Sequence, residues 1–470
     1  MQWEPDTAFS SASGFPNPIG TRREFQPPSQ SRASTMTNSR ELASVLAAET
    51  CRRPVAMVAP SQVDDLLVAI RAAGEAGVPI VLGTPEQRSA TFGNAVGSTG
   101  LPIVELPVDS DGVRVLAATS GTTGRARFVA WTDEVLDHQA KATTTRICTG
   151  PSTRYGLALG VTSSYGFSVV NIAARIGGTV TAFSPTDHNG LIEAICSGSI
   201  DTLDTVPGVW RYLAAACSLH SDLLDAMTRL QVRGVGGEVV PHSLLNFYAE
   251  AGAPLHNGYG LTEAGPNVAI SYGAAYGVHT VGTPLPGTGV RVTHDGAVLV
   301  SGPSLARRIL DTVTGQYVDN PAVDADGWLD TGDVGAVDES GRLTILGRSD
   351  GLLVGHGKKL HSSILEETFR DLASDSADLV ALQLDPHRIG RPRVVIAVID
   401  DPATAPMRLG TEFTARARQF PPEFRVREIV QVGRDEVRTT ASGKLDRHDL
   451  SALVTMYLED NGGSRCVRTF

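Results

Sequence analysis

Apolar residues along the first part of the chain alternate between the spacing of strands and the spacing of helices. Val55–Val58 and Val78–Leu82 are short, nearly continuous apolar runs typical of buried strands. Between them, Val63, Leu66, Leu67, Ile70 and Ala73 fall on one face of a helix over residues 62–76, and another helix is expected from residue 40. Strands and helices that alternate in this way predict a parallel sheet covered by helices.

The same analysis predicts the organisation of the rest of the chain. Strands are expected over 112–118 and 155–161, helices up to residue 176 and over 191–197 and 209–217, and β-structure from residue 290. The predicted fold class is α/β: a large N-terminal domain of parallel α/β subdomains plus a β-rich subdomain, and a small mobile α+β C-terminal domain. The expected boundaries are a disordered leader over 1–38, a core domain over 39–349, a C-terminal domain over 350–458 and a tail over 459–470.

Composition narrows the class of protein. The chain has 470 residues, 41% of them hydrophobic and 19% charged, which is ordinary for a globular protein of two or more domains. Its net charge of −11 argues against a nucleic-acid partner, and no apolar run is long enough to span a membrane. Five scattered cysteines without a C-x-x-C pair favour a reducing, cytoplasmic location.

A loop rich in hydroxyl groups and glycine follows the predicted strand over 112–118. Its sequence, residues 119–127, is Thr-Ser-Gly-Thr-Thr-Gly-Arg-Ala-Arg, and an apolar run follows it. Small residues let backbone N–H groups approach a polyphosphate, while hydroxyls and guanidinium groups add donors and positive charge. The kinase-type P-loop pattern does not occur in the sequence. A solvated Ser/Thr/Gly turn is the structural alternative.

Three further segments carry side chains suited to binding a nucleotide. In the segment 257–263, the Tyr259 ring can stack on a base, the Thr262 hydroxyl can reach a phosphate, and the Glu263 carboxylate can hold Mg²⁺. In the segment 327–333, Asp333 can accept both hydroxyls of a ribose. Near the C-terminus, Lys444 stands on a Ser-Gly-containing loop, suited to a developing phosphate charge.

These segments, in this order, resemble the signature motifs of the adenylate-forming superfamily: acyl- and aryl-CoA synthetases, peptide-synthetase adenylation domains and luciferases. The resemblance covers about residues 40–455 and includes the motifs at 119–127, 257–263, 327–333, 347–350 and 439–447. Ala126 and Arg127 replace the usual Pro and Lys, and Leu353-Val354 stands where the family often has Ile-Lys. Arg127 keeps the positive charge as a planar fork.

The resemblance implies a role for each matching residue. The implied catalytic residues are Arg127, Thr262, Glu263 (also the Mg²⁺ ligand) and Lys444, and the implied hinge between domains is Asp350. The implied nucleotide-binding residues are Thr119, Ser120, Gly121, Thr122, Thr123, Gly124, Gly237, Glu238, Asn257, Gly258, Tyr259, Gly260, Asp333 and Arg348.

The implied pocket for the acid contains Tyr165, Gly166, Phe167, Gly236 and Gly282. The family has an aromatic or His residue that gates the acyl pocket, and Tyr165 and Phe167 fit that role. The structural alternative is that both rings fill the core. Amino-acid-activating relatives have an Asp that pairs with the substrate ammonium where Gly166 stands. An unpaired ammonium in a buried pocket costs several kcal/mol, so an α-amino acid is disfavoured unless another acidic residue compensates. The glycine-rich wall favours an aryl or short acyl acid.

The resemblance thus implies ATP-dependent activation of a carboxylic acid to acyl-AMP, with ATP and Mg²⁺ as cofactors and coenzyme A as the favoured acceptor. A monomer or homodimer active in secondary metabolism is expected. Transfer of the acyl group to an amine or to a free-standing carrier protein is the alternative within the same chemistry. A non-catalytic nucleotide-binding protein is the alternative from another class.

Overall fold

The computed structural model describes residues 39–50, 54–92, 103–106, 112–119, 127–184, 186–355, 358–374, 377–384, 393–400, 411–438, 445–459 and 466–468. The predicted leader, the loop residues 120–126 and Lys444 therefore lie outside the described residues. Contacts group Asn38–Phe470 into one compact unit, and the predicted boundary between residues 349 and 350 stays a prediction.

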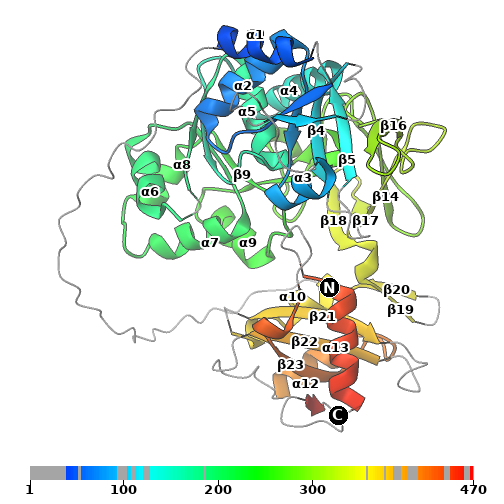
Figure 1. Ribbon diagram of the computed structural model, residues 1–470. Coiled ribbons are helices and arrows are strands. Elements are labelled where there is room, and N and C mark those ends of the chain that lie inside the picture. The colour runs from blue at the N-terminus through cyan, green and yellow to red at the C-terminus, as the bar shows by residue number, and fades with distance from the viewer. Residues whose placement is uncertain are drawn as a thin grey trace. The chain divides into compact units, whose positions relative to one another are not determined.

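The first sheet is built around the strands predicted from the N-terminal pattern (Figure 1). Its strands run in the order β16 (Gln316–Asp319), β15 (Arg308–Asp311), β5 (Arg127–Thr132), β4 (Val113–Thr119), β2 (Ile80–Leu82), β1 (Val55–Val58) and β3 (Ile103–Glu105). Only β1, β2 and β4 are parallel, because β5 turns back beside β4 and β15 and β16 extend that edge antiparallel. The expected parallel sheet is thus confirmed in part here.

The second sheet is the more regular α/β unit. Its strands run in the order β12 (Thr283–Pro284), β11 (Asn267–Ile270), β10 (His256–Gly260), β9 (Val232–Val235), β8 (Thr202–Thr205), β6 (Arg154–Ala158) and β7 (Thr179–Ala182). The five strands from β10 to β7 are parallel, and β11 and β12 are antiparallel.

Helices accompany these two sheets: α1 (Ser39–Thr50), α2 (Val63–Ala76), α3 (Pro85–Phe92), α4 (Asp133–Ile147), α5 (Ser164–Ile176), α6 (His188–Ser197), α7 (Pro207–Ala216), α8 (Leu223–Thr228) and α9 (His242–Glu250). Helix α2 shows how the local sequence sets the two ends of a helix. Asp64 and Asp65 lie in its first turn, where they favour the positive end of the helix dipole, and Gly77 ends it in a left-handed conformation.

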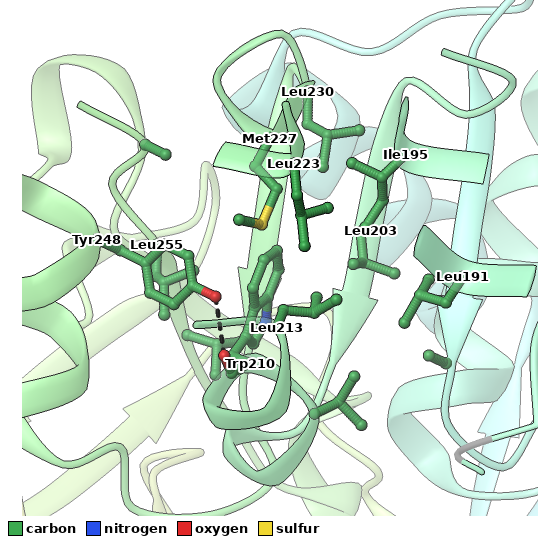
Figure 2. Packing of buried hydrophobic residues seen from close by; sticks show 14 of the residues in the cluster. Leu191, Ile195, Leu203, Trp210, Leu213, Leu223, Met227, Leu230, Tyr248 and Leu255 are labelled. Atoms are coloured by element: carbon green, nitrogen blue, oxygen red, sulfur yellow. Dashed lines mark hydrogen bonds between the residues drawn. The ribbon is translucent and has the colours of Figure 1, made fainter. Parts of the chain in front are cut away.

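One face of the second sheet is closed by a large apolar cluster (Figure 2). Trp210 is fully buried at its centre, with Leu203 and Leu213 around it. The Tyr248 hydroxyl donates to the Trp210 carbonyl at 2.8 Å, so the polar atom of this buried phenol is satisfied. The cluster fixes β8 and β9 firmly on that face and leaves their opposite face for other side chains.

The β-rich part predicted from residue 290 is a four-stranded antiparallel sheet of β13 (Gly289–Val292), β14 (Ala297–Ser301), β17 (Leu329–Val337) and β18 (Leu343–Arg348). Short 3₁₀ turns lie at η1 (Thr262–Ala264), η2 (Gly273–Ala275), η3 (Ser349–Gly351), η4 (Arg370–Leu372) and η5 (Arg434–Glu436).

The C-terminal residues form the expected α+β structure. A hairpin of β19 (Leu352–Gly355) and β20 (Lys358–His361) precedes a sheet of β21 (Asp378–Leu384), β22 (Arg393–Asp400), β23 (Val426–Gly433) and β24 (Cys466–Arg468). Helices α10 (Ser362–Thr368), α12 (Thr411–Arg418) and α13 (Arg447–Glu459) accompany this sheet (Figure 1). Apolar clusters on both faces of the sheet include Phe369 and Phe413 on one side and Leu450 and Val454 on the other.

Candidate functional site

Side chains from both large sheets and from the β-rich sheet line one open cavity of about 1870 Å³. Most of the sequence-predicted site residues that the structure describes lie on its wall: Thr119, Arg127, Tyr165, Gly236, Gly237, Glu238, Asn257, Gly258, Tyr259, Gly260, Thr262, Glu263, Asp333, Arg348 and Asp350. Residues more than 200 positions apart in the sequence are thus brought to a common surface.

The end of β10 supplies the aromatic residue of this wall. Tyr259 lies on β10, and its hydroxyl donates to Asp333 Oδ2 at 2.5 Å. Burial, and then the negative charge of Asp333, raise the pKa of Tyr259 well above its usual range, so the phenol stays protonated and remains the donor. The contact joins the second sheet to the β-rich sheet.

Asp333 is held from its other side by Arg348. The two residues are direct partners in the pairing of β17 with β18, and Arg348 Nη1 lies 3.1 Å from Asp333 Oδ1. The same guanidinium nitrogen donates to the Thr331 carbonyl at 2.7 Å. The Asp333 side chain is buried, whereas Arg348 is exposed, so a buried acceptor is paired with an exposed donor. This pair can present both an acceptor and a cation to a polar ligand.

The turn after β10 positions Thr262. Its hydroxyl lies 2.8 Å from the Ser164 hydroxyl at the start of α5, and its carbonyl accepts from Trp131 Nε1 at 3.0 Å. The next carbonyl, that of Glu263, accepts from the Ala306 amide at 2.9 Å. Contacts from three distant segments therefore fix this short turn, and Thr262 lines the cavity.

Glu263 is the acidic residue of that turn. Burial raises the pKa of its carboxyl, while the positive charges of Arg348 and Arg127 lower it. Among the described residues, no group of three or more His, Cys, Asp or Glu side chains could hold a metal ion. Magnesium at a nucleotide site is bound by one or two carboxylates together with substrate phosphates. A single carboxylate that lines the cavity fits that requirement.

The predicted phosphate loop connects β4 and β5. Thr119 and Arg127 are paired in the antiparallel register of these strands, so the ends of the loop are brought together. Thr119 is buried and Arg127 is exposed on the cavity wall. Ser120, Gly121, Thr122, Thr123 and Gly124 lie outside the described residues, as does Lys444.

Three predicted pocket residues lie off the cavity wall. Phe167 is fully buried and packs against Trp131, with ring centroids 6.1 Å apart, so it belongs to the core under α5. Gly166 lies against the Gly160 carbonyl, where an added Cβ would come within 2.2 Å of the oxygen. Gly282 has φ of +74° and lies against the Ile270 carbonyl. Close backbone approach explains both glycines.

Tyr165 does line the cavity, and it brings in a residue that the motif analysis missed. Its hydroxyl donates to Asp204 Oδ1 at 2.8 Å, and Asp204 also lies on the wall. Burial raises the pKa of Asp204 to about 6, against a smaller lowering by the Tyr165 hydrogen bond. Ser164, next to Tyr165, was missed as well. The only sequence signal was one acidic residue within the short segment Thr202–Thr205, which matches none of the motifs.

Comparison with known proteins settles the family. The sequence matches the model of the AMP-binding enzyme family over residues 32–310. The chain belongs to this family. The predicted resemblance to adenylate-forming enzymes is thereby confirmed.

Curated relatives of this AMP-binding protein carry ligase names. It is 38% identical over 139 residues to the long-chain-fatty-acid–CoA ligase FadD15 of Mycobacterium bovis, a match that covers 29% of this chain and 22% of the relative. It is 27% identical over 312 residues to the putative acyl–CoA ligase YdaB of Bacillus subtilis, covering 63% and 60%. The feruloyl-CoA synthase of Amycolatopsis sp is 26% identical over 400 residues, covering 80% and 79%. The chain thus spans less than two thirds of the first two relatives.

Solved structures confirm the α/β fold of this AMP-binding protein. The O-succinylbenzoate coenzyme A synthetase MenE of Bacillus subtilis, in complex with AMP, matches with a TM-score of 0.68 at 19% identity, over 88% of this chain and 91% of that one. The amide bond synthetase McbA of Marinactinospora thermotolerans matches with a TM-score of 0.70 at 19% identity, over 88% and 94%. In the part of the chain that the structure describes, no helix is long and apolar enough to cross a membrane.

Proposed function

We propose that this protein joins a carboxylic acid, aryl or short acyl, to the thiol of coenzyme A through an acyl-AMP intermediate made from ATP. The observation that carries the proposal is the linked set of polar side chains on one cavity. Tyr259 bonds Asp333, Asp333 pairs with Arg348, and Thr262 and Glu263 follow on the adjoining turn. Such a set offers a base-stacking ring, a ribose acceptor, phosphate donors and a carboxylate for Mg²⁺.

In the proposed nucleotide site the adenine lies along the Tyr259 ring. Gly237 and Gly258, where an added Cβ would meet little, leave room for a flat base, and Gly260, Glu238 and Asn257 lie beside them on the wall. Asp333 accepts from the ribose hydroxyls, and Arg348 then turns from Asp333 towards the ribose or a phosphate. Thr119 and the loop over 120–124 bind the outer phosphates together with Arg127.

The proposed chemistry has two steps. An oxygen of the substrate carboxylate attacks the α-phosphorus of ATP, the bond from that phosphorus to the bridging oxygen breaks, and pyrophosphate leaves. The coenzyme A thiolate then attacks the acyl carbon, and AMP leaves. Thr262 donates to an α-phosphate oxygen, while Arg127 and Lys444 offset the charge that develops on the phosphates.

Glu263 is the residue proposed to hold Mg²⁺, which would neutralise phosphate charge. The chain itself contributes position: the three contacts that fix the turn hold Thr262 and Glu263 in place before the substrate binds. We further propose that the C-terminal residues rotate about Asp350 between the two steps. Asp350 is exposed on η3.

The names of the curated relatives support coenzyme A as the acceptor. Long-chain-fatty-acid–CoA ligase and feruloyl-CoA synthase both denote transfer to that thiol. The identity of the acid is less constrained, because those names span fatty and aryl acids. Tyr165 and Gly236, which lie together on the wall, support a flat acid over a long chain.

The test is pyrophosphate release from ATP and Mg²⁺ with a panel of aryl, short-chain, fatty and amino acids, with and without coenzyme A. Mass spectrometry identifies the product as acyl-AMP, acyl-CoA or an amide. Lys444→Ala is the inactive control, and Lys141→Ala, at an exposed position of α4, is the matched control.

The proposal predicts acyl-CoA from at least one acid, with activity lost in Lys444→Ala and kept in Lys141→Ala. Acyl-AMP that accumulates and ignores coenzyme A assigns the acceptor to an amine or a carrier protein instead. Nucleotide binding without pyrophosphate release from any acid contradicts the enzymatic proposal.

A further inference from the structure

A carboxylate stands on the wall of the acid-binding part of the cavity, where the motifs of the family assign none. Asp204 lies on β8, directly opposite Gly234 of β9 in the parallel pairing of the two strands. It lines the cavity, and its Oδ1 accepts the Tyr165 hydroxyl at 2.8 Å. Tyr165 is thereby held against the sheet with its oxygen at Asp204.

The neighbouring strand is shaped around this pair. A Cβ added at Gly234 would come within 2.2 Å of Asp204 Oδ1 and 3.1 Å of the Tyr165 hydroxyl oxygen. The Gly234 carbonyl is itself fixed by Trp210 Nε1 at 2.9 Å, from the buried cluster on the other face of the sheet (Figure 2). Gly234 therefore makes the room that Asp204 and Tyr165 occupy on the cavity side.

Asp204 has no cationic partner among the residues that the structure describes. Its one hydrogen bond there is to Tyr165, which leaves Oδ2 without a protein donor in that part of the chain. The other titratable group whose pKa its charge affects is Tyr155, a phenol and not a cation. Burial raises the pKa of Asp204 to about 6. Asp204 is half-buried, and a partly desolvated carboxylate without a cation is costly unless something pairs with it.

A purely structural role accounts poorly for that cost. Tyr165 needs only an acceptor, and an amide or a backbone carbonyl would satisfy its hydroxyl without a partly desolvated carboxylate. The carboxylate is explained if the missing donor arrives with the ligand of the cavity that Asp204 faces.

We infer that Asp204 determines specificity for an acid that carries a hydrogen-bond donor, an amino or hydroxyl group, at the end remote from its reacting carboxylate. The inference rests on the proposed function for the position of that carboxylate. It names the substrate class of the same site.

The position of Asp204 determines where the donor group of the substrate lies. Thr262, proposed at the α-phosphate, contacts Ser164, and the next residue is Tyr165, whose side chain spans the distance to Asp204. The donor is therefore expected at the hydroxyl end of the Tyr165 side chain, away from the reacting carboxylate. An α-amino group is too close to its own carboxylate, whereas a ring-substituted aryl acid reaches. Asp204 therefore does not supply the missing partner for an α-ammonium group, and an α-amino acid stays disfavoured.

The experiment compares acids of one shape: 4-aminobenzoate, 4-hydroxybenzoate, 4-methylbenzoate and their 3-substituted isomers, with phenylalanine as the α-amino acid. For the full-length protein, kcat/KM is measured by pyrophosphate release, and the affinity for each acid by calorimetry, which needs no turnover. The variants are Asp204→Leu, which removes the acceptor at similar size, and Asp204→Asn, with Asp225→Asn on the surface of α8 as the matched control.

We expect the wild type to prefer an amino- or hydroxy-substituted acid over its methyl isostere by roughly 10- to 100-fold. Asp204→Leu should abolish or reverse that preference, and Asp225→Asn should keep it. Asp204→Asn separates the two donors. With Tyr165 on its oxygen, the amide presents N–H to the ligand, so a hydroxyl can still accept and an arylamine cannot.

Equal use of the methyl acids by the wild type, or an unchanged preference in Asp204→Leu, overturns the inference. So does a failure of every donor-bearing acid to bind. If no acid releases pyrophosphate but calorimetry shows the same preference and its loss in Asp204→Leu, the inference stands and the proposed reaction fails.

Discussion

The Ser164 hydroxyl lies 2.8 Å from the Thr262 hydroxyl, and this contact joins the start of helix α5 to the η1 turn. Ser164 precedes Tyr165, on the side of the cavity proposed to bind the acid, whereas Thr262 precedes Glu263, on the side proposed to bind the nucleotide. The two halves of the proposed reaction therefore meet at a single hydrogen bond. The proposed attack of carboxylate on phosphorus takes place beside it.

Ser164→Ala is expected to lower kcat about fivefold, because a hydrogen bond of about 1 kcal/mol that orients Thr262 is lost. The KM for ATP should change little, since Trp131 still holds the Thr262 carbonyl. Steady-state pyrophosphate release at varied ATP measures both constants. An unchanged kcat would mean that Ser164 does not position Thr262.

Asp333→Ala is expected to raise the KM for ATP at least about tenfold, because a charged acceptor contributes about 1.5–3 kcal/mol to binding a hydroxyl-bearing ligand. Tyr259→Phe removes only the donor to Asp333 and keeps the ring for stacking, so its KM should rise by less. ATP titrations of pyrophosphate release compare the two variants. Equal effects would place the main contribution in the Tyr259–Asp333 bond and not in the ribose.

Asp204→Asn is expected to stabilise the ligand-free protein in a pH-dependent way. The pKa of Asp204 is raised to about 6 from 3.8, so the folded state holds its proton where the unfolded state does not. Stability therefore falls as pH rises from about 4 to about 6, by at most about 3 kcal/mol, and the loss is complete above that range.

The variant should escape this loss, so its gain over the wild type grows between pH 4 and pH 7 and vanishes at the acid end. Urea denaturation at several pH values measures the difference, with Asp225→Asn as the control. A gain that does not depend on pH would contradict the raised pKa.

Two glycine substitutions are expected to act in opposite directions. Gly74 lies inside α2 with nothing within 4 Å of an added Cβ, so Gly74→Ala should stabilise the protein by about 0.5–1 kcal/mol. At Gly166 the Cβ would lie 2.2 Å from the Gly160 carbonyl oxygen, and Gly166→Ala should destabilise. Thermal unfolding of both variants tests this, and a neutral Gly166→Ala would show that α5 can shift away from Gly160.

The sequence predicted the elements of the fold well where the apolar period was local. Helix α2 and strands β1 and β2 appear close to the expected positions. The mixed first sheet was not predicted, because β5 pairs with β15 across about 180 residues and no local pattern encodes that partner.

At the site, too, local motifs were predicted from the sequence and contacts between distant segments were not. Motif residues such as Tyr259, Thr262 and Asp333 could be named, since their spacing carries the chemistry. Phe167 could not be separated from its neighbour Tyr165, because only the packing of α5 decides which ring turns into the core. Asp204 was not identified from the sequence because its role depends on a hydrogen bond to Tyr165 on another element. No pattern within its own segment indicates that contact.

The most direct test of the central claim is acyl-AMP formation, followed by mass spectrometry and pyrophosphate release, with wild-type protein and Lys444→Ala. The account predicts an acid-dependent adenylate in the wild type, converted to acyl-CoA when coenzyme A is added, and almost none in Lys444→Ala. An equal yield of adenylate from both proteins, or ATP bound and left intact with every acid that binds, would contradict it.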